Sequence, residues 1–181
     1  MWSIAEASRL TTSLLEAELP RRLKHVRATG HRASVLRHMP DDDRQLMAIA
    51  GTLHDIGYAP DLVEVGFHPI DGARFLRSDG WDETIVNLVA HHSCAAIEAE
   101  RRGLLAELNG EFSRNDSLPH DELCFCDMTT GPAGQLMTVE QRLADIKERY
   151  GAGSIVGDSI ALAEPELLAS VYRVQAKIDS A

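Results

Sequence analysis

Apolar side chains recur along most of the chain at the spacing of one helix face. Between Pro20 and Met39 they stand three or seven positions apart with basic residues between them, at Leu23, Val26, Ala33 and Leu36. Steps of three, four and seven residues bring side chains to the same side of an α-helix. Pro40 closes the segment, because proline does not readily continue a helix. We therefore predict a helix over residues 20–39 that carries His25.

A second apolar stripe leads directly to a histidine and an aspartate. The stripe consists of Leu46, Ile49, Ala50 and Leu53. We predict Asp41 as the N-cap of this helix, because its side chain can accept a hydrogen bond from the first turn and two further aspartates follow at the positive helix end. The helix runs into His54 and Asp55, and Gly57 ends it.

The middle of the chain predicts two more helices and two loops. Residues 58–67 contain proline and glycine and predict a loop with a short helical turn, after which His68 begins a helix that Gly80 closes. Asp82 can cap a long helix that follows. The core-facing side of that helix carries Ile85, Leu88, Val89 and His92. Residues 103–118 predict a short helix and then a mobile loop, which is the expected lid or variable surface.

The C-terminal part predicts three helices. Pro119 suits the first turn of a helix that carries Asp127 near its end and stops at Gly131. Residues 138–141 have the spacing of a capping box and open a helix to Tyr150, and a final helical region from Ser154 is expected to break near Pro165. No stretch has the alternation of a strand. We predict an all-α compact helical bundle with a metal site in its core: one domain over residues 1–181, with a metal-binding part at about 20–130 and C-terminal helices at 138–180 packed on it.

Composition and charge agree with a folded helical protein and limit the kinds of partner that it can bind. Of the 181 residues 44% are hydrophobic and 5% aromatic, which suits a core of aliphatic side chains. The net charge of −10 disfavours bulk nucleic acid and anionic membranes, although a metal cluster can still create a local site for phosphate. Charged residues interrupt the N-terminal segment and no window reaches a membrane-spanning length. With three cysteines that form no disulfide pattern, we expect a soluble, cytoplasmic protein.

Side chains that can bind a metal ion occur on separate predicted helices. They are His25, His54, Asp55, His68, His91, His92 and Asp127. Helices that meet in a bundle core can bring such groups to one point. Imidazoles and carboxylates without thiolate favour Fe, Mn, Co, Ni, Zn or Mg over a structural zinc site. A complete mononuclear set is available in His25, His54, Asp55 and Asp127. A second ion becomes possible if Asp55 bridges and His68 joins one of His91 and His92, and we favour this dinuclear arrangement.

The ordered motifs resemble a known family. They are Arg22-Leu-Lys-His25, Leu53-His-Asp-Ile-Gly57, His68-Pro-Ile-Asp-Gly72, Ala90-His-His92 and Cys126-Asp127. Together, over about Pro20 to Thr130, they look like the HD-domain metal-dependent phosphohydrolases. The resemblance implies a helical domain in which one or two divalent ions are held, the first by His25, His54, Asp55 and Asp127. His68 and His92 match the positions that bind a second ion in dinuclear members.

The resemblance implies a metal-dependent phosphohydrolase that cleaves a small phosphate ester or nucleotide through metal-activated water. In this interpretation Asp55 fixes the nucleophile and His91 can pass a proton, so both are candidate catalytic residues. Many members carry lysine where this chain has Tyr58. Arg22, Lys24 or Arg27 would then bind phosphate, and we predict Arg22 and Lys24 for that role.

Other interpretations stay open at this point. Some HD-domain proteins use the same ligand order in a dinuclear iron oxygenase, which would act here on an organophosphonate or similar small molecule. A nucleotide-binding module without catalysis is a further alternative. Ordinary helix-end roles compete for His68 and Asp127, and His91 is open as ligand, substrate contact or neither. The expected partner is a small phosphorylated substrate, with no bulk nucleic acid and no membrane, and the pattern leaves the oligomeric state unknown.

Overall fold

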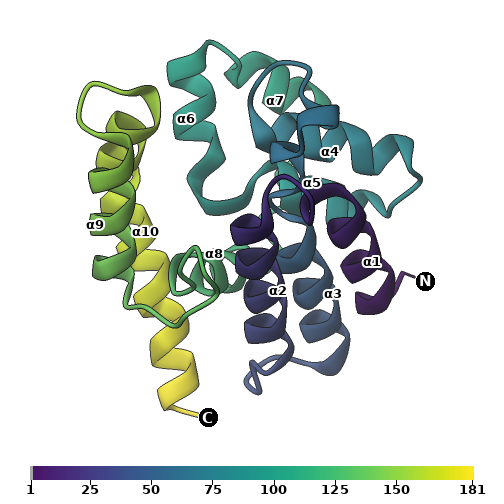
Figure 1. The fold of residues 1–181 in the computed structure, drawn as a ribbon. Coiled ribbons are helices and arrows are strands. Elements are labelled where there is room, and N and C mark those ends of the chain that lie inside the picture. Colours follow the sequence, from purple (N-terminus) through teal and green to yellow (C-terminus); the bar gives the residue numbers. More distant parts are fainter. Residues whose placement is uncertain (1) are drawn as a thin grey trace.

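The computed structural model describes residues 2–181, and over that range the chain is built from helices (Figure 1). Ten are α-helices: α1 (Ile4–Leu15), α2 (Pro20–Ser34), α3 (Asp41–Leu53), α4 (His68–Ser78), α5 (Glu83–Ala90), α6 (Ala95–Arg102), α7 (Leu105–Glu111), α8 (His120–Met128), α9 (Val139–Tyr150) and α10 (Ile155–Asp179). Three short 3₁₀ turns lie between them: η1 (Ile56–Tyr58), η2 (Pro60–Leu62) and η3 (His92–Cys94). The predicted all-α fold is confirmed. None of the helices in the described part of the chain combines the length and apolarity that crossing a membrane requires.

Helices α2 and α3 pack unusually closely, side by side with α1 (Figure 1). A Cβ atom on Gly30 of α2 would lie only 2.0 Å from Thr52 Oγ1, and one on Gly51 of α3 would lie 3.3 Å from the backbone of Gly30. Glycine at both positions therefore lets the two backbones approach. This approach brings His25, in the middle of α2, next to His54 at the end of α3.

A second glycine contact holds η1 against the start of α4. A Cβ atom on Gly57 would lie 2.1 Å from the carbonyl oxygen of His68 and 2.5 Å from the backbone nitrogen of Gly72. Only glycine permits this contact. It places His68, the first residue of α4, beside the end of α3 and thus beside Asp55.

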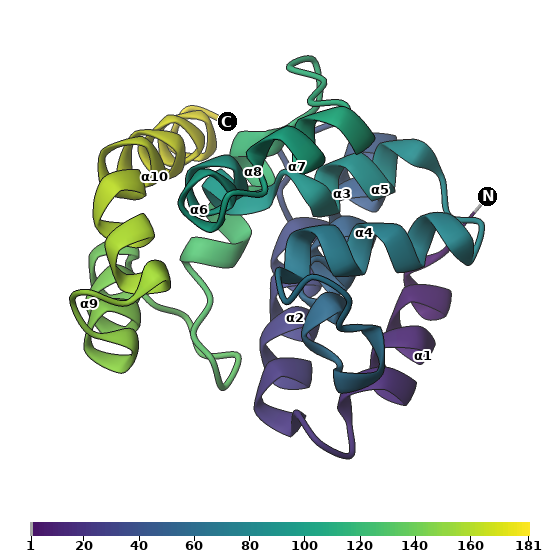
Figure 2. The same ribbon diagram turned by 90° about the horizontal axis from the view of Figure 1, so that it is seen from above.

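Two large apolar clusters form the core. One gathers around α8, α9 and α10 and includes the fully buried Leu123, Leu167 and Val174. The other gathers around α4 and α5 and includes Ile70 and Val86. Figure 2 shows the α9–α10 hairpin on one side of the molecule and α1 to α4 on the other. Helix α10 packs on α8 and α6, so the hairpin stands beside the helices that carry the candidate ligands.

Several predicted helix boundaries are confirmed. Asp82 caps α5 by accepting a hydrogen bond from the backbone N–H of Thr84. Thr138 and Gln141 form the predicted capping box of α9. The predicted loop after the short helix α7 is present at residues 112–119.

Other boundaries were predicted wrongly. Asp41 is the first residue of α3 rather than its N-cap, and its side chain pairs with Arg44 instead. Helix α5 ends at Ala90, so His92 lies in η3 and not on a long helix. The expected break near Pro165 does not occur, because α10 continues through it. The helix α1 was not predicted.

Candidate metal centre

Six of the predicted metal ligands meet in one cluster. Five elements deliver them: α2 carries His25, the end of α3 carries His54 and Asp55, α4 begins with His68, η3 begins with His92 and α8 carries Asp127. All are buried except His68, which is partly exposed. Residues more than 100 positions apart in the chain thus share one point, since a hydrogen-bond distance of 3.1 Å joins His25 Nε2 to Asp127 Oδ1.

The two oxygens of Asp55 face two different groups of imidazoles. Asp55 Oδ2 lies 3.4 Å from His54 Nε2 and 3.8 Å from His25 Nε2. On the other side, Asp55 Oδ1 lies 3.3 Å from His68 Nε2 and 3.8 Å from His92 Nε2. This is the arrangement in which one carboxylate can bridge two ions.

Asp127 completes the first group and is held by a residue that sequence reasoning missed. Its Oδ1 lies 3.7 Å from His54 Nε2, while its Oδ2 accepts a hydrogen bond from the hydroxyl of Ser93. Ser93 and Cys94 have left-handed backbone conformations, with φ of 45° and 62°. Such conformations are costly for residues other than glycine, and here they turn Ser93 toward Asp127.

Three imidazoles are oriented by backbone carbonyls. The Nδ1 atoms of His25, His54 and His92 lie 3.2, 2.8 and 2.6 Å from the carbonyl oxygens of Gly131, Gly51 and Val89, respectively. A carbonyl only accepts, so each Nδ1 donates its hydrogen and each Nε2 faces the cluster, where it offers a lone pair to a metal ion once it carries no proton. The Nε2 atom of His54 is buried and has no hydrogen-bond partner. A cation with nitrogen and oxygen ligands would satisfy it, so the residues present fit a metal ion.

The electrostatics of the cluster also suit a cation. Burial raises the pKa of Asp55, but Arg22 and His54 outweigh burial and hold that pKa well below its ordinary value. His25 and His54 likewise lower the pKa of Asp127 against the effect of burial. Burial lowers the pKa of His54, but Asp55 and Asp127 overcome this and raise it to about 9. Burial and the neighbouring imidazoles lower the pKa of His92 to about 3. Two ionised carboxylates therefore lie among imidazoles that face inward.

The ligand atoms form three sets that could each hold an ion. Within each set the atoms lie within 4.8 Å of one another: His25, His54 and Asp55; His54, His92 and Asp127; and Asp55, His68 and His92. The first and third sets share only Asp55. Their division is the one expected for two ions bridged by that carboxylate.

Arg22 lies beside the cluster and contacts both Tyr58 and Asp55. The Tyr58 ring stacks on His68 with 4.0 Å between ring centroids, and the guanidinium of Arg22 lies 3.9 Å from the centre of the Tyr58 ring. Arg22 also forms an ion pair with Asp55. Tyr58 stands where many family members have lysine, and its ring orients the guanidinium of Arg22 beside the cluster.

Three other predicted contacts are not brought to the cluster. Two cavities of about 100 and 380 Å³ lie beside the cluster, and the exposed Lys24 lines neither of them. Arg27 donates a hydrogen bond to Thr12 instead. The Nε2 atom of His91 lies 3.0 Å from the carbonyl oxygen of Phe112. The His91 ring thus faces the segment after α7 and also lines neither cavity.

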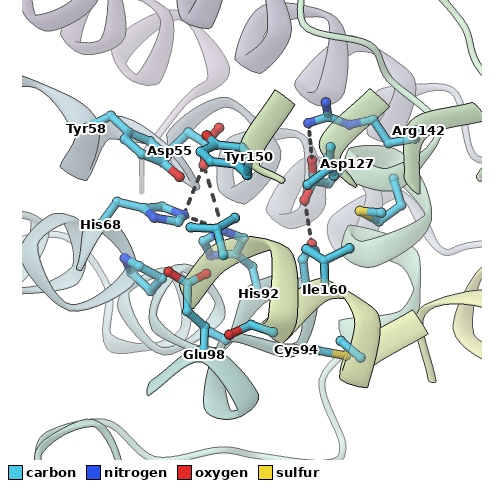
Figure 3. A pocket seen from close by; sticks show the side chains of 18 of the residues that line it. Asp55, Tyr58, His68, His92, Cys94, Glu98, Asp127, Arg142, Tyr150 and Ile160 are labelled. Atoms are coloured by element: carbon cyan, nitrogen blue, oxygen red, sulfur yellow. Dashed lines mark hydrogen bonds and ion pairs between the residues drawn. The ribbon is translucent and has the colours of Figure 1, made fainter. Parts of the chain in front are cut away.

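A cavity of about 100 Å³ opens onto the cluster (Figure 3). Asp55, His68, His92 and Asp127 line it on one side. The α9–α10 hairpin contributes Arg142, Arg149, Tyr150 and Ile160. Sequence reasoning missed these hairpin residues. The signal for Arg142 was its position beside Leu143, with Val139 and Ile146 one turn away on the same helix face, which makes it a charge on an apolar side.

These features define an all-helical protein with a buried histidine–aspartate centre able to hold metal ions. The family model for the HD domain matches residues 22–151. The chain therefore belongs to the HD-domain family, part of the superfamily of metal-dependent phosphohydrolases, whose domains bind divalent metals.

The chain is also similar to ribonuclease Y of Mesoplasma florum, with 46% identity over 52 residues. That match covers 28% of this chain and 10% of the ribonuclease, so the shared part is about a tenth of the relative's length. No solved structure matches this chain.

Proposed function

We propose that this protein is a metal-dependent phosphohydrolase that cleaves a small phosphate ester or nucleotide. The observation that carries the proposal is the position of Asp55. Its two oxygens face two imidazole groups on the floor of a cavity that Arg22 and Arg142 also line. A carboxylate–imidazole cluster under guanidinium groups suits a phosphoryl group, whose oxygens need neutralisation by several positive centres.

The residues of the chain divide the work of such a reaction. One or two divalent ions, when bound, would supply Lewis acidity and lower the pKa of a water molecule. Asp55 would hold that water in line with the phosphorus. Arg22, kept in place by Tyr58, and Arg142 would orient the phosphoryl oxygens and offset their charge. Because His91 lies outside the cavity, it would take no part in proton transfer.

The size of the cavity supports a small reacting group. A volume of about 100 Å³ accepts a phosphoryl group and little more, so the rest of the substrate must extend outside it. The similarity to ribonuclease Y supports hydrolysis of a phosphate ester as the reaction type, although the net charge of −10 does not favour long polyanions as substrates.

An activity screen with matched variants tests the proposal. The purified protein, loaded in turn with Mn²⁺, Mg²⁺, Fe²⁺, Co²⁺, Ni²⁺ or Zn²⁺, is assayed for release of the aryl alcohol from aryl phosphate monoesters and diesters, and for the products of nucleotide hydrolysis. We expect hydrolysis that a chelator stops. Asp55→Ala should lose it by at least about a hundredfold with helical circular dichroism kept, because the other ligands and the core remain. The control Asp61→Ala, an exposed aspartate of η2, should keep it.

Two outcomes would overturn the proposal. If the folded, metal-bound protein hydrolyses none of these esters and nucleotides, it is not a phosphohydrolase of the proposed kind. If instead iron-loaded protein consumes dioxygen with an organophosphonate and no ester is hydrolysed, the oxygenase interpretation replaces it.

A further inference from the structure

A second cavity adjoins the one above the metal centre. Its volume is about 380 Å³, and it shares four lining residues with the first cavity: Arg22, Arg142, Arg149 and Tyr150. We call it the side cavity. Its remaining wall includes His25 and the residues around the start of α2. Both cavities therefore reach the same four side chains.

The side cavity is basic in a protein that is acidic as a whole. Four arginines line it: Arg21, Arg22, Arg142 and Arg149. Glu18 is the one carboxylate among its lining residues, whereas the chain carries 28 acidic against 18 basic residues. Asp55 pairs with Arg22, and Asp145 pairs with Arg142 and Arg149, so these two carboxylates offset part of the positive charge. The positive charge that remains, against the overall sign of the chain, indicates an anionic ligand.

Arg142 gives a second reason to expect an anion. Its side chain is 7% exposed, and its Nε atom is buried without a hydrogen-bond partner. Its terminal nitrogens are close to carboxylates, 3.2 Å from Asp145 Oδ2 and 4.0 Å from Asp127 Oδ1. A buried donor without a partner is destabilising, and an anion in the cavity can supply the acceptor.

The backbone at the start of α2 adds to the positive potential in the side cavity. Leu19 and Pro20 line the side cavity, and no side chain caps the first turn of this helix. The positive end of a 15-residue helix thus faces the same space as the arginines.

We propose that the side cavity binds a second phosphate group of the substrate, next to the phosphoryl group held at the metal centre. The substrate class is then a compound with adjacent phosphates, such as a nucleoside diphosphate or triphosphate, rather than a simple monophosphate. This inference rests on the proposed function, because it needs the first phosphoryl group to lie over the cluster. Arg21 distinguishes the two sites, since it lines the side cavity and not the first one.

The test compares two ligands that the enzyme cannot hydrolyse. Calorimetry on the Mn²⁺-loaded protein gives dissociation constants for inorganic phosphate and for methylenediphosphonate, in which two phosphonate groups are adjacent. We expect the diphosphonate to bind at least about tenfold more tightly, because each charge-assisted hydrogen bond adds roughly that factor. Capture of Mn²⁺ by the diphosphonate in solution is the same for every variant, so the ratio between variants is unaffected.

Single substitutions test whether the second phosphonate group binds in the side cavity. Arg21→Ala should weaken diphosphonate binding about five- to tenfold and leave phosphate binding within about twofold, and Arg21→Lys should restore part of the loss. The control Arg9→Ala removes an exposed arginine of α1 that lines neither cavity, and it should change neither constant.

The outcomes separate this inference from the proposed function. Equal affinity for the two ligands, or equal loss of both in Arg21→Ala, would overturn the side-cavity site even if the protein hydrolyses phosphate esters. Failure of the metal-loaded protein to bind either ligand would overturn the proposed function and the inference with it.

Discussion

Gly57 shows how a single residue without chemistry of its own fixes the site. It allows the backbone of η1 to touch the start of α4, which sets His68 opposite Asp55. The atoms that a side chain at position 57 would meet belong to the backbone of His68 and Gly72, so they cannot move aside independently. A larger residue at position 57 would therefore move His68 relative to Asp55.

We expect Gly57→Ala to lower the free energy of unfolding by about 1–3 kcal/mol, because the new methyl group forces two packed elements apart. Urea titration followed by circular dichroism measures the change. Gly110→Ala is the matched control: nothing lies within 4 Å of a Cβ atom there, and alanine suits the helix α7 at least as well as glycine. A Gly57→Ala protein as stable as the control would show that the contact carries no strain.

Ser93 acts on the centre through Asp127. Its hydroxyl donates to Oδ2 and so leaves Oδ1 turned toward His25 and His54. Ser93→Ala keeps the backbone but frees this carboxylate oxygen, and we expect affinity for Mn²⁺ to fall about tenfold, as is usual when the hydrogen-bond partner of a ligand is removed. Titration calorimetry with Mn²⁺ measures it. The exposed Ser13, which bonds only to its own helix, gives the control Ser13→Ala, and equal affinities in the two variants would remove Ser93 from this role.

At the scale of elements, the starts of the helices that carry the ligands were predictable because strong local signals mark them. The end of α2 was not, since the helix was predicted to run to Met39 and ends at Ser34. Gly57 and Pro69 bracket the loop between α3 and α4, and Pro40 precedes α3. The end of α5 had no such signal, because neither glycine nor proline occurs between His91 and Ala95. There the long-range hydrogen bond from Ser93 to Asp127 accompanies a left-handed turn that local sequence disfavours.

The uninterrupted α10 has a similar physical reason. Proline removes the amide that would bond to the carbonyl four residues earlier, here that of Ala161. Both Pro165 and Ala161 are exposed, so water can bond to that carbonyl and the helix continues. The position of Arg142 over the cluster was unpredictable for another reason: it depends on how the hairpin packs on α6 and α8, and nothing within the hairpin sequence specifies this.

A titratable carboxylate lies in the contact between α10 and α8. Arg173 and Ser170 of α10 both donate to the carboxylate of Asp121 on α8, at 2.7 Å. The hydrogen bond from Arg173 lowers the pKa of Asp121 below its ordinary value of 3.8, and burial opposes it only in part. A carboxylate with a lowered folded pKa adds stability above the unfolded value and loses it as the pH falls through the folded value.

We therefore expect the free energy of unfolding to fall as the pH drops below about 4, and Asp121→Asn to reduce this dependence while lowering stability at neutral pH. Chemical denaturation at a series of pH values measures both. Asp116→Asn, at a loop aspartate whose side chain is 89% exposed, should follow the unmodified protein. If Asp121→Asn shows an unchanged acid dependence, the α8–α10 contact is not its source.

At the scale of the whole molecule, the metal centre ties together elements that otherwise belong to different apolar clusters. Leu123, on the helix of Asp127, lies in one cluster and Ile70, on the helix of His68, lies in the other, while α3 contributes residues to both. A metal ion that binds only the folded chain adds stability according to its concentration and affinity. At a hundred times the dissociation constant the gain is about 2.7 kcal/mol, or roughly 5–10 °C in melting temperature for a chain of this size.

The stability gained on metal binding should increase with pH, because of the protonation of His54. In the metal-free protein its pKa is raised to about 9, so protonated His54 adds stability that is complete below about pH 6.5 and is lost as the pH rises through about 9. Metal binding requires the neutral imidazole and must displace that proton, so the ion competes less well at low pH. We expect Mn²⁺ to raise the melting temperature more at pH 8.5 than at pH 6.5, as scanning fluorimetry with and without chelator would record. Asp55→Ala should abolish the rise at both pH values and Asp61→Ala should keep it; a rise that Asp55→Ala leaves intact would place the ion elsewhere.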